Sequence, residues 1–415
     1  MRTTVLLFTR SYPYSIGAEN GFISQELEVL RARFARVWLI PTITGGDVEP
    51  VTAPNVTVNT DYARYRRSSL RRALFALGSI LDLRFLREVR ANALTWLRRP
   101  GALVQALREH VIARITESWI RRLPDVDWSN VVLYTWWFDG TTLGLSRFAR
   151  RAGAPVITRA HGADLYESRQ ATGYIPFRNQ SLEAVRQVFS VSDAGARYLS
   201  ARYPEFRQKV HVSLLGVDDP GHLNQRSTDG VFRIASCSFL LPVKRIDLMI
   251  RGIARLGRSH PQRRFEWTHI GDGERAERAA LESLARSTMP ANVQYRFLKY
   301  PGRAGLNEFY TTQPVDVFIN TSESEGTPVA IMEAMSFGIP IVATAVGGNV
   351  EIVTSDNGVV TSAHPEPDEI ADALTSVLCD EARGVRLRAG SRERWQREYS
   401  AARNYDTFAS AIQAL

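Results

Sequence analysis

Cysteine and lysine are scarce in this chain of 415 residues. The two cysteines, Cys237 and Cys379, are too few for a disulfide framework and lack the C-x-x-C spacing of a zinc site. We therefore expect a reducing compartment and no zinc site. Lysine occurs only at Lys209, Lys244 and Lys299, so arginine carries almost all of the positive charge.

Long apolar runs are also missing. The first run, 5–8, ends before Arg10 and is too short for a signal peptide or a membrane-spanning helix. No later stretch reaches the roughly eighteen apolar residues that a spanning helix needs. The sequence therefore predicts a cytoplasmic protein whose membrane contact would be peripheral, on the inner face of the membrane.

The net charge of +9, from 52 basic and 43 acidic residues, is concentrated in one segment. Residues 62–122 contain fourteen arginines and four acidic residues, so this segment carries +10 and the rest of the chain is almost neutral. Nucleic-acid-binding proteins usually spread basic charge over a larger surface, and we expect no nucleic-acid partner.

The same basic segment is rich in leucine. The leucines recur near helical spacing, which predicts a helical insertion: Leu70, Leu74, Leu77, Leu81, Leu94 and Leu97. A basic, leucine-rich helical surface is typical of docking on an anionic membrane, and a solvated helical face shows the same pattern. Both interpretations stay open at this point.

The length of the chain exceeds what one hydrophobic core supports, which predicts two domains. Short apolar runs alternate with helix-period segments, as in parallel α/β sheets. The predicted strands are 4–8, 37–40, 131–134, 156–158, 188–191, 231–237, 265–270, 293–297, 315–320 and 339–343. We expect two doubly wound, Rossmann-like domains facing a central cleft, with ligands at the carboxyl ends of the strands.

The expected domain bounds follow from the turn-rich segment 216–230, which we interpret as the linker. Residues 1–222 form the first, acceptor-side domain, interrupted by the helical insertion 62–122. Residues 226–395 form the second domain. The last helix, 396–415, is expected to return to the first domain.

The most informative stretch, 322–338, follows the predicted strand 315–320. Thr327 suits a helix N-cap and Pro328 the first helical position, so Glu325 precedes a helix and Glu333 lies within it. A helix start at the end of a strand offers free N–H groups to a phosphate. Carboxylates accept hydrogen bonds from sugar hydroxyls, so this pattern indicates a polyhydroxylated ligand with a charged middle.

The full string from Ser322 to Glu351, with its two glutamates, its Glu-Ala-Met and its Gly-Gly, resembles the signature of glycosyltransferase family 4, retaining enzymes of the GT-B fold. Segments 166–169 and 173–178 are similar to members that build capsule or exopolysaccharide sugars. The resemblance implies a retaining hexosyltransferase. Its donor would be a nucleotide diphosphate sugar and its acceptor a glycan hydroxyl, and a lipid-linked oligosaccharide acceptor would fit the basic segment.

The resemblance also implies roles for individual residues. His161, in the segment 159–166, would hydrogen-bond the transferred sugar, and Glu325 would bind its hydroxyls. Lys244 would neutralise the leaving diphosphate, and Glu333 would bind the ribose hydroxyls. The other predicted donor-binding residues are Gly17, Arg245, Gly326, Thr327, Pro328 and Val329.

No cofactor or metal is implied, because Lys244 and the helix start can meet the charge of the diphosphate. The sequence departs from the family at Phe239, where an arginine is usual, and at Lys299, where a glycine is common. A sugar-nucleotide epimerase of the GT-B fold and a non-catalytic sugar-nucleotide-binding protein therefore stay open as alternatives. A dinucleotide-dependent dehydrogenase is disfavoured, because the loop after the first strand lacks Gly-x-Gly-x-x-Gly.

Overall fold

The computed structural model describes residues 2–14, 16, 19–124 and 126–415. The chain forms two compact units, residues 1–215 with 402–415 and residues 216–401. The first unit thus ends at Leu215 rather than at 222, and the C-terminal segment joins it from Ala402 rather than from 396.

The bounds differ because the segment expected to be a free linker packs into the second unit. The side chain of Asn224 is buried and donates hydrogen bonds to the carbonyl oxygens of Tyr310 at 2.6 Å and Gln313 at 2.8 Å. Val217 forms a parallel β-bridge with Ser400. Residues 216–230 therefore belong to the second unit.

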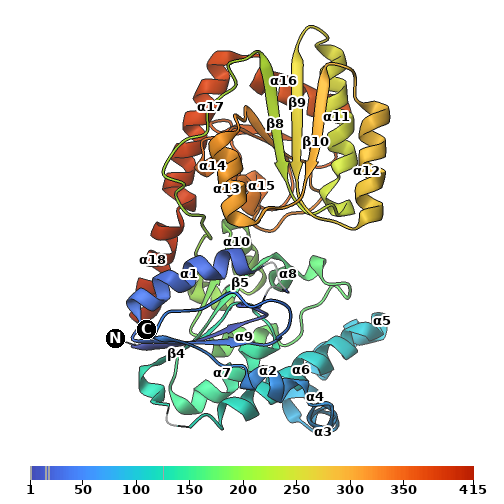
Figure 1. The fold of residues 1–415 in the computed structure, drawn as a ribbon. Coiled ribbons are helices and arrows are strands. Elements are labelled where there is room, and N and C mark those ends of the chain that lie inside the picture. Colours follow the sequence, from blue (N-terminus) through green and yellow to red (C-terminus); the bar gives the residue numbers. More distant parts are fainter. Residues whose placement is uncertain (1, 15, 17–18, 125) are drawn as a thin grey trace. The chain divides into compact units, whose positions relative to one another are not determined.

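The first unit contains a seven-stranded sheet in the order β3-β2-β1-β4-β5-β6-β7, all parallel (Figure 1). The strands are β1 (Thr4–Thr9), β2 (Arg36–Pro41), β3 (Val56–Val58), β4 (Val131–Thr135), β5 (Val156–Ala160), β6 (Gln187–Ser190) and β7 (Val210–Val212). The helices are α1 (Asn20–Arg33), α2 (Asp61–Arg67), α3 (Ser69–Ile80), α4 (Leu83–Ala91), α5 (Ala93–Arg98), α6 (Pro100–Ile120), α7 (Gly140–Ala152), α8 (Gly162–Leu165), α9 (Arg178–Ala184), α10 (Asp193–Arg202) and α18 (Ala401–Gln413). The strand order reverses between β1 and β4, which marks the switch point where doubly wound sheets bind ligands.

The second unit repeats this plan with six parallel strands in the order β10-β9-β8-β11-β12-β13. The strands are β8 (Val231–Cys237), β9 (Arg264–Ile270), β10 (Val293–Leu298), β11 (Val317–Asn320), β12 (Ile341–Thr344) and β13 (Gly358–Thr361). The helices are α11 (Ile246–Ser259), α12 (Arg275–Thr288), α13 (Gly302–Thr312), α14 (Val329–Ser336), α15 (Asn349–Ile352), α16 (Pro367–Leu378) and α17 (Glu381–Arg394). Its switch point lies between β8 and β11. The prediction of two doubly wound α/β domains is confirmed.

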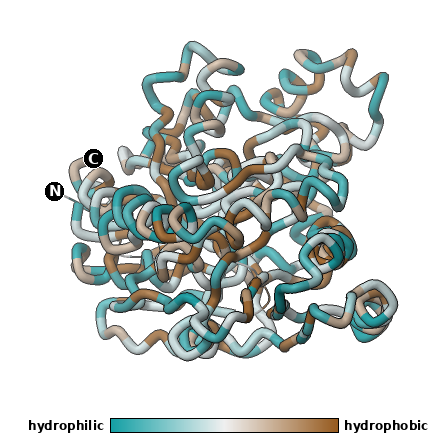
Figure 2. Tube along the Cα trace, turned by 90° about the horizontal axis from the view of Figure 1, so that it is seen from above, coloured by the Kyte–Doolittle hydropathy of each residue, from teal (hydrophilic) through white to brown (hydrophobic). Residues whose placement is uncertain are grey.

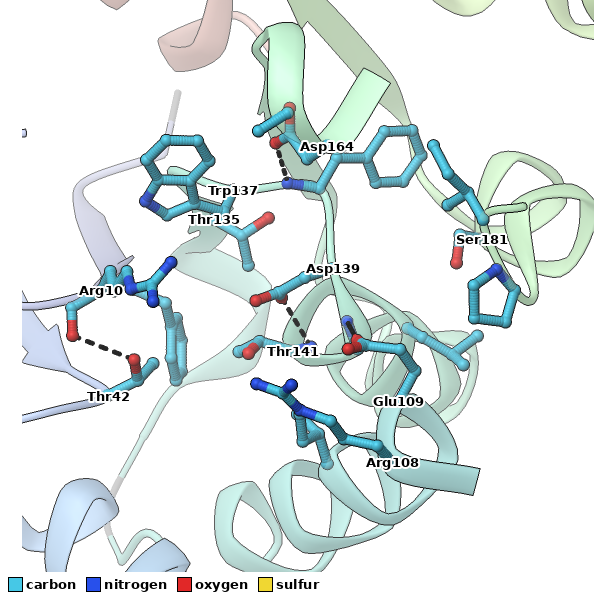
Figure 3. Close-up of a pocket in the computed structure, with 18 of the residues that line it drawn as sticks. Arg10, Thr42, Arg108, Glu109, Thr135, Trp137, Asp139, Thr141, Asp164 and Ser181 are labelled. Atoms are coloured by element: carbon cyan, nitrogen blue, oxygen red, sulfur yellow. Dashed lines mark hydrogen bonds between the residues drawn. The ribbon is translucent and has the colours of Figure 1, made fainter. Parts of the chain in front are cut away.

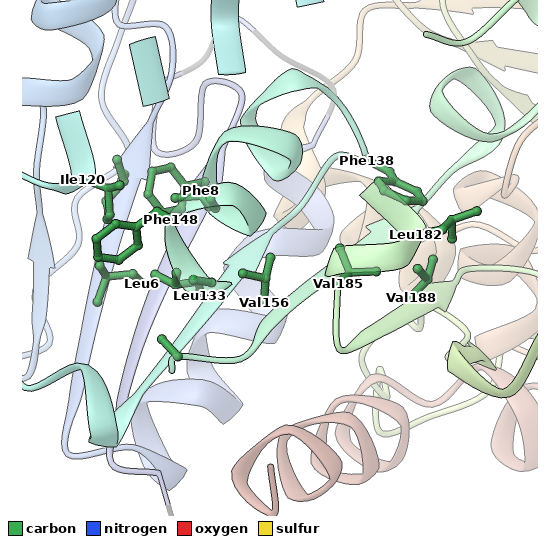
Figure 4. Close-up of a cluster of buried hydrophobic side chains, with 14 of the residues drawn as sticks. Leu6, Phe8, Ile120, Leu133, Phe138, Phe148, Val156, Leu182, Val185 and Val188 are labelled. Atoms are coloured by element: carbon green, nitrogen blue, oxygen red, sulfur yellow. The ribbon is translucent and has the colours of Figure 1, made fainter. Parts of the chain in front are cut away.

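Each sheet is buried on both faces, which is why its strands read as nearly continuous apolar runs. In the first unit, the strands contribute Leu6, Leu133 and Val156 to a buried cluster with Phe148 of α7 and Ile120 of α6 (Figure 4). Burying one such side chain stabilises the fold by about 1.5–3 kcal/mol. Figure 2 shows hydrophobic and hydrophilic residues interspersed along the trace.

The basic segment folds as five consecutive helices, α2 to α6, within the first unit. Helix α6 packs against α3, α5 and α7 and connects the insertion to the sheet-covering helices. In the described part of the chain we find no helix with the length and apolar character needed to cross a bilayer.

Candidate active site

Glu325 and Lys244 meet at the carboxyl end of β11 in the second unit. Glu325 Oε1 accepts hydrogen bonds from Lys244 Nζ at 2.7 Å, Ser322 Oγ at 2.6 Å and Asn320 Nδ2 at 3.1 Å. The side chains of Glu325 and Lys244 are 10% and 21% exposed. The two predicted site residues, 81 positions apart in the chain, are therefore brought together as a partly buried ion pair.

Arg245, predicted to bind the donor, has a different position from its neighbour Lys244. Its backbone is left-handed, with φ of 49°, and its guanidinium donates to the carbonyl oxygens of Thr321, Ser322 and Ala363 at 2.7–3.0 Å. Its hydrogen bonds therefore hold the loop after β11 in place. A role in holding this loop is what the contacts show, and donor binding by Arg245 stays a prediction.

The start of α14 offers unused backbone donors. The helix begins at Val329 with Pro328 as its N-cap, one residue later than the sequence pattern predicts, and the buried Thr327 hydroxyl finds no partner among the described residues. The N–H groups of Gly326, Thr327 and Val329 likewise donate to no acceptor in the part of the chain that the structure describes. Such a set of N–H groups at a helix start favours an anion.

Two glycines explain the second half of the motif. A Cβ at Gly347 would lie 1.9 Å from the carbonyl oxygen of Glu325, and one at Gly348 would lie 2.2 Å from that of Gly326. Gly347 also has a positive φ of 47°, and the N–H of Gly348 donates to Gly326 at 3.1 Å. The Gly-Gly pair is therefore required for the loop that carries Glu325 to pack closely.

Glu333 lies within α14 and is half-buried. Its carboxyl group makes no side-chain hydrogen bond with the described residues, and burial raises its pKa to about 7, against the opposing effect of Arg303. Burial and the charge of Glu333 together raise the pKa of Tyr300 to about 12. An unpartnered carboxyl group with a raised pKa is a common feature of ligand sites.

Both departures from the family pattern are visible at the ends of the strands. The Phe239 ring, which follows β8, is 58% exposed, and Lys299, which follows β10, is exposed as well. Arg303, at the start of α13, pairs with Asp218 at 3.0 Å.

In the first unit, His161 directly follows β5. Its backbone N–H donates to Asp164 Oδ1 at 2.6 Å. Its ring packs against Trp136 and Trp137, with ring centroids 5.3 and 4.5 Å apart. The ring is largely buried, and neither of its nitrogens has a hydrogen-bond partner among the described residues. Its Nδ1 lies 3.7 Å from Asp164 Oδ2, and hydrogen bonding of a sugar by His161 stays a prediction.

Gly17, the remaining predicted residue, lies outside the described residues. Next to it, Glu19 organises the loop after β1, which sequence reasoning did not identify. Its carboxylate accepts hydrogen bonds from the N–H groups of Ser11 at 2.5 Å and Tyr12 at 2.9 Å, and from Trp137 Nε1 at 2.7 Å. Its only sequence signal is an acidic residue immediately before a helix.

A cavity of about 320 Å³ opens at the carboxyl ends of β1, β2 and β4. Figure 3 shows the guanidinium groups of Arg10 and Arg108 and the carboxyl groups of Glu109 and Asp139 directed into it. Its size suits a ligand no larger than a few sugar rings. Sequence reasoning missed this cavity because Arg108 and Glu109 fall in the basic segment, which we interpreted as surface.

Two carboxyl groups of the cavity, those of Glu109 and Asp139, have raised pKa values. Burial and repulsion by Asp139 raise the pKa of Glu109 to about 7, and burial also raises the pKa of Asp139. Each carboxylate accepts one backbone N–H: Glu109 from Gly140 at 2.7 Å and Asp139 from Thr141 at 2.8 Å. The buried Thr141 hydroxyl, which lines the cavity, has no partner among the described residues. Like the Glu333 carboxyl group, the Thr141 hydroxyl is therefore suited to hydrogen-bonding a polar ligand.

The two doubly wound sheets define the GT-B class of glycosyltransferase fold, and solved structures agree. The chain covers all of the lipopolysaccharide outer core galactosyltransferase WaaB in its apo form, with a TM-score of 0.68 and 13% identity over 100% of both chains. It matches Anabaena Alr3699/HepE in complex with UDP and glucose with a TM-score of 0.62 and 17% identity, over 99% of this chain and 100% of that one. At these identities, the likeness concerns the fold.

Sequence comparison points in the same direction. Residues 224–396 match the model described as glycosyl transferases group 1. A D-inositol 3-phosphate glycosyltransferase of Xylanimonas cellulosilytica is 28% identical over 310 residues, 69% of this chain and 73% of the relative. The putative colanic acid biosynthesis glycosyltransferase WcaL of Escherichia coli is 27% identical over 278 residues, 63% of this chain and 64% of the relative. The resemblance to glycosyltransferases is thereby confirmed.

Proposed function

We propose that this protein is a retaining glycosyltransferase that moves a sugar from a nucleotide diphosphate sugar to a hydroxyl of a glycan acceptor. The observation that carries the proposal is the arrangement at the end of β11. There, Glu325, which pairs with Lys244, directly precedes the unused N–H groups at the start of α14. The match of residues 224–396 to the model of glycosyl transferases group 1 supports the same reaction class.

The donor diphosphate would bind at Gly326, Thr327 and Val329, with Lys244 beside it. Negative charge grows on the diphosphate as the glycosidic bond breaks, so these donors would bind the transition state more tightly than the ground state. They would do so without a metal ion or cofactor. Alr3699/HepE, whose structures have been solved in complex with UDP and with UDP-glucose, supports a nucleotide sugar as donor.

Glu333 would accept hydrogen bonds from the ribose hydroxyls. Its raised pKa means that the free protein holds this carboxyl group partly protonated near neutral pH. Hydroxyl donors favour the ionised form, so a bound ribose would lower the pKa of Glu333. Glu325, held by Lys244, would accept hydrogen bonds from the hydroxyls of the transferred sugar. In the first unit, His161 would hydrogen-bond a sugar hydroxyl.

Retention can proceed on the reacting face if the departing phosphate takes the proton of the acceptor hydroxyl. This route needs no general base and no covalent intermediate on a carboxylate. We propose this route because each group assigned to the donor already has another role. Lys244 and the backbone N–H groups would bind the diphosphate, and Glu325 and Glu333 would accept hydrogen bonds from hydroxyls. A product of inverted configuration would contradict it.

The cavity of the first unit would hold the acceptor. Its mixed carboxyl, hydroxyl and guanidinium lining can hydrogen-bond a polyhydroxylated group. We propose a lipid-linked oligosaccharide acceptor in cell-surface polysaccharide synthesis, met at the cytoplasmic face of the membrane. The names of WcaL and WaaB, which refer to colanic acid and lipopolysaccharide, support this class of product.

The test begins with thermal unfolding of the full chain against a panel of UDP and GDP sugars. The expected result is stabilisation by one nucleotide sugar at concentrations where the free nucleotide has less effect. Glu325→Gln should then abolish glycoside formation while Glu323→Gln, an exposed neighbour, leaves it unchanged. Undiminished turnover by Glu325→Gln would contradict the assignment.

The exposed Phe239 stands where an arginine is usual, which leaves one alternative: a non-catalytic protein that binds a nucleotide sugar. Such a protein would be stabilised by the donor and form no product with any acceptor. Consumption of the donor with neither free sugar nor glycoside as product would instead indicate an epimerase. The same panel, analysed for products, separates these outcomes.

A further inference from the structure

Helices α3 to α5 expose an unusual number of large apolar side chains. We call the solvent-facing side of 69–98 the leucine surface. Leu70, Leu81 and Leu97 on it are 71%, 82% and 81% exposed. Its other exposed apolar residues are Leu74, Leu77, Ile80, Leu83, Leu86 and Leu94.

Helix α3 exposes a second apolar face in addition to the one that packs on the unit. Leu70, Leu74 and Leu77 recur at spacings of four and three residues and so share one face, which is turned to solvent. The inward side carries Phe75 and Ala76, which pack against the core of the unit, and the fully buried Ser79. The leucines point outward instead, so the fold of this unit does not use the leucine face.

The charge that accompanies these leucines has one sign. Residues 69–98 contain six arginines and two acidic residues, Asp82 and Glu88. Asp82 caps α4 through the N–H of Arg84 at 2.9 Å and lies 3.3 Å from His110 Nε2. Glu88 is buried and accepts the N–H of Phe177 at 2.9 Å. Both carboxylates are therefore used within the unit.

The arginines, in contrast, point away from the fold. Arg72, Arg87, Arg90 and Arg98 are exposed, and their guanidinium groups make no hydrogen bond or ion pair with the residues that the structure describes. An apolar face bordered by unpaired arginines and without an outward carboxylate is complementary to anionic headgroups above acyl chains. Leucine side chains that stay in water contribute nothing to stability, which favours a partner that buries them. A basic protein partner would be repelled by the arginines.

We infer that the leucine surface docks the protein on a membrane rich in anionic lipid. The leucines enter the boundary between headgroups and acyl chains, and the arginines bind the lipid phosphates. This inference deepens the proposed function by naming where the acceptor is met, and it rests on that function only for the acceptor. Docking itself requires no transfer reaction.

Helix α6 relates the leucine surface to the acceptor cavity. Its first turns expose Leu103 and Val104, directly after α5, and the following residues Gln105, Arg108 and Glu109 line the cavity. One rigid helix therefore carries both features. A glycan whose lipid stays in the bilayer would reach the cavity along α6.

The test is co-sedimentation of the full chain with vesicles of phosphatidylglycerol and phosphatidylcholine, compared with phosphatidylcholine alone. We expect binding to the anionic vesicles at low salt and at least tenfold weaker binding without anionic lipid. The double substitution Leu74→Glu with Leu77→Glu should weaken binding at least tenfold. Val385→Glu, at an exposed position of α17, serves as the matched control and should bind like the unmodified protein.

A second variant separates the roles of charge and leucine. Replacing Arg72, Arg87, Arg90 and Arg98 by Gln should remove the preference for anionic lipid and the salt dependence of binding. Circular dichroism and the melting temperature verify that each variant is folded. Failure of the unmodified protein to bind anionic vesicles, or equal binding by the double leucine variant, would overturn the inference.

Two further outcomes also decide the case. If the unmodified protein is dimeric by sedimentation velocity and the double leucine variant is monomeric, a second copy covers the leucine surface and the inference is wrong. Transfer to a water-soluble acceptor should be unchanged in the double leucine variant. Loss of vesicle binding with retained transfer supports docking, whereas vesicle binding without transfer in any assay would leave docking intact and contradict the proposed function.

Discussion

The two units present the same switch point in two different ways. In the second unit, nearly all of the site comes from one stretch, Ser322 to Glu351, to which the chain adds Lys244 from the β8–α11 loop. In the first unit, the cavity draws on separate segments, with Arg10 after β1, Glu109 in α6 and Asp139 after β4. A site whose residues come from one segment can be recognised from the sequence. A site whose residues come from several segments can be recognised only once the fold is known.

If the second unit performs the chemistry, removing its one lysine beside Glu325 should have the largest effect. Lys244→Ala should lower kcat by about 10³-fold, or about 4 kcal/mol, because a preorganised charge is lost where negative charge develops. Lys299→Ala removes an exposed lysine of the same unit and should change kcat less than twofold. Steady-state kinetics with the identified donor measures both. A loss of less than tenfold in Lys244→Ala would move the chemistry away from this motif.

The close packing of the motif loop predicts the next largest effect. Gly347→Ala should lower the free energy of unfolding by about 3 kcal/mol, because the new Cβ meets the Glu325 carbonyl and the backbone has positive φ. Gly221→Ala is the matched control, since Gly221 also has positive φ but open space around it. It should cost about 1–2 kcal/mol. Urea unfolding compares the two, and equal losses would show that the loop can relax.

The same contrast explains how much of the structure the sequence could predict. Long apolar runs such as Val231–Cys237 were correctly predicted as strands, because burial on both faces leaves a strong pattern. The strands that were missed are β3, β7 and β13, which have three or four residues and lie at sheet edges. Edge strands pair on one side only and need fewer apolar residues, so their local signal is weak.

For the site, the sequence identified residues better than it identified their contacts. The motif predicted that Glu325 precedes a helix and that Glu333 lies within it, as the structure has them. It did not predict that Arg245 would hold three carbonyl oxygens, because nothing local distinguishes a structural arginine from a ligand-binding one. Glu109 was overlooked for a related reason: its burial depends on α7 and β4, which are distant in sequence.

One carboxyl group in each unit has a pKa of about 7, which allows a direct comparison of Glu109 and Glu333. Their unfolded-state pKa is 4.5, so between these values the native state retains a proton that the unfolded chain releases. The free energy of unfolding therefore falls as pH rises from about 4.5 to about 7, by at most about 3 kcal/mol for each group. Glu109→Gln and Glu333→Gln should each remove their share, which makes the variants more stable than the unmodified protein at pH 8.

Thermal unfolding from pH 5 to pH 8 measures this difference. Buried His110 and His269, whose pKa values are lowered to about 4, act in the opposite direction below pH 6.5, but they are present in every variant and cancel in the comparison. Adding the donor should stabilise the unmodified protein and Glu109→Gln more strongly as the pH rises. The donor should stabilise Glu333→Gln to the same extent at every pH. The same response in all three proteins would contradict donor binding at Glu333.

The smallest expected effect concerns Phe239, one of the two positions where this chain departs from the family pattern. Phe239→Arg places a guanidinium at the exposed end of β8, within the unit that holds Lys244. An exposed charge is partly screened by water, so donor affinity should rise only about fivefold, or about 1 kcal/mol, and the rise should shrink at high salt. Leu241→Arg, also exposed in this loop, is the matched control and should have little effect. If Phe239→Arg instead weakens donor binding, the aromatic ring itself contacts the donor, and the second unit is adapted to its own ligand rather than deficient in one charge.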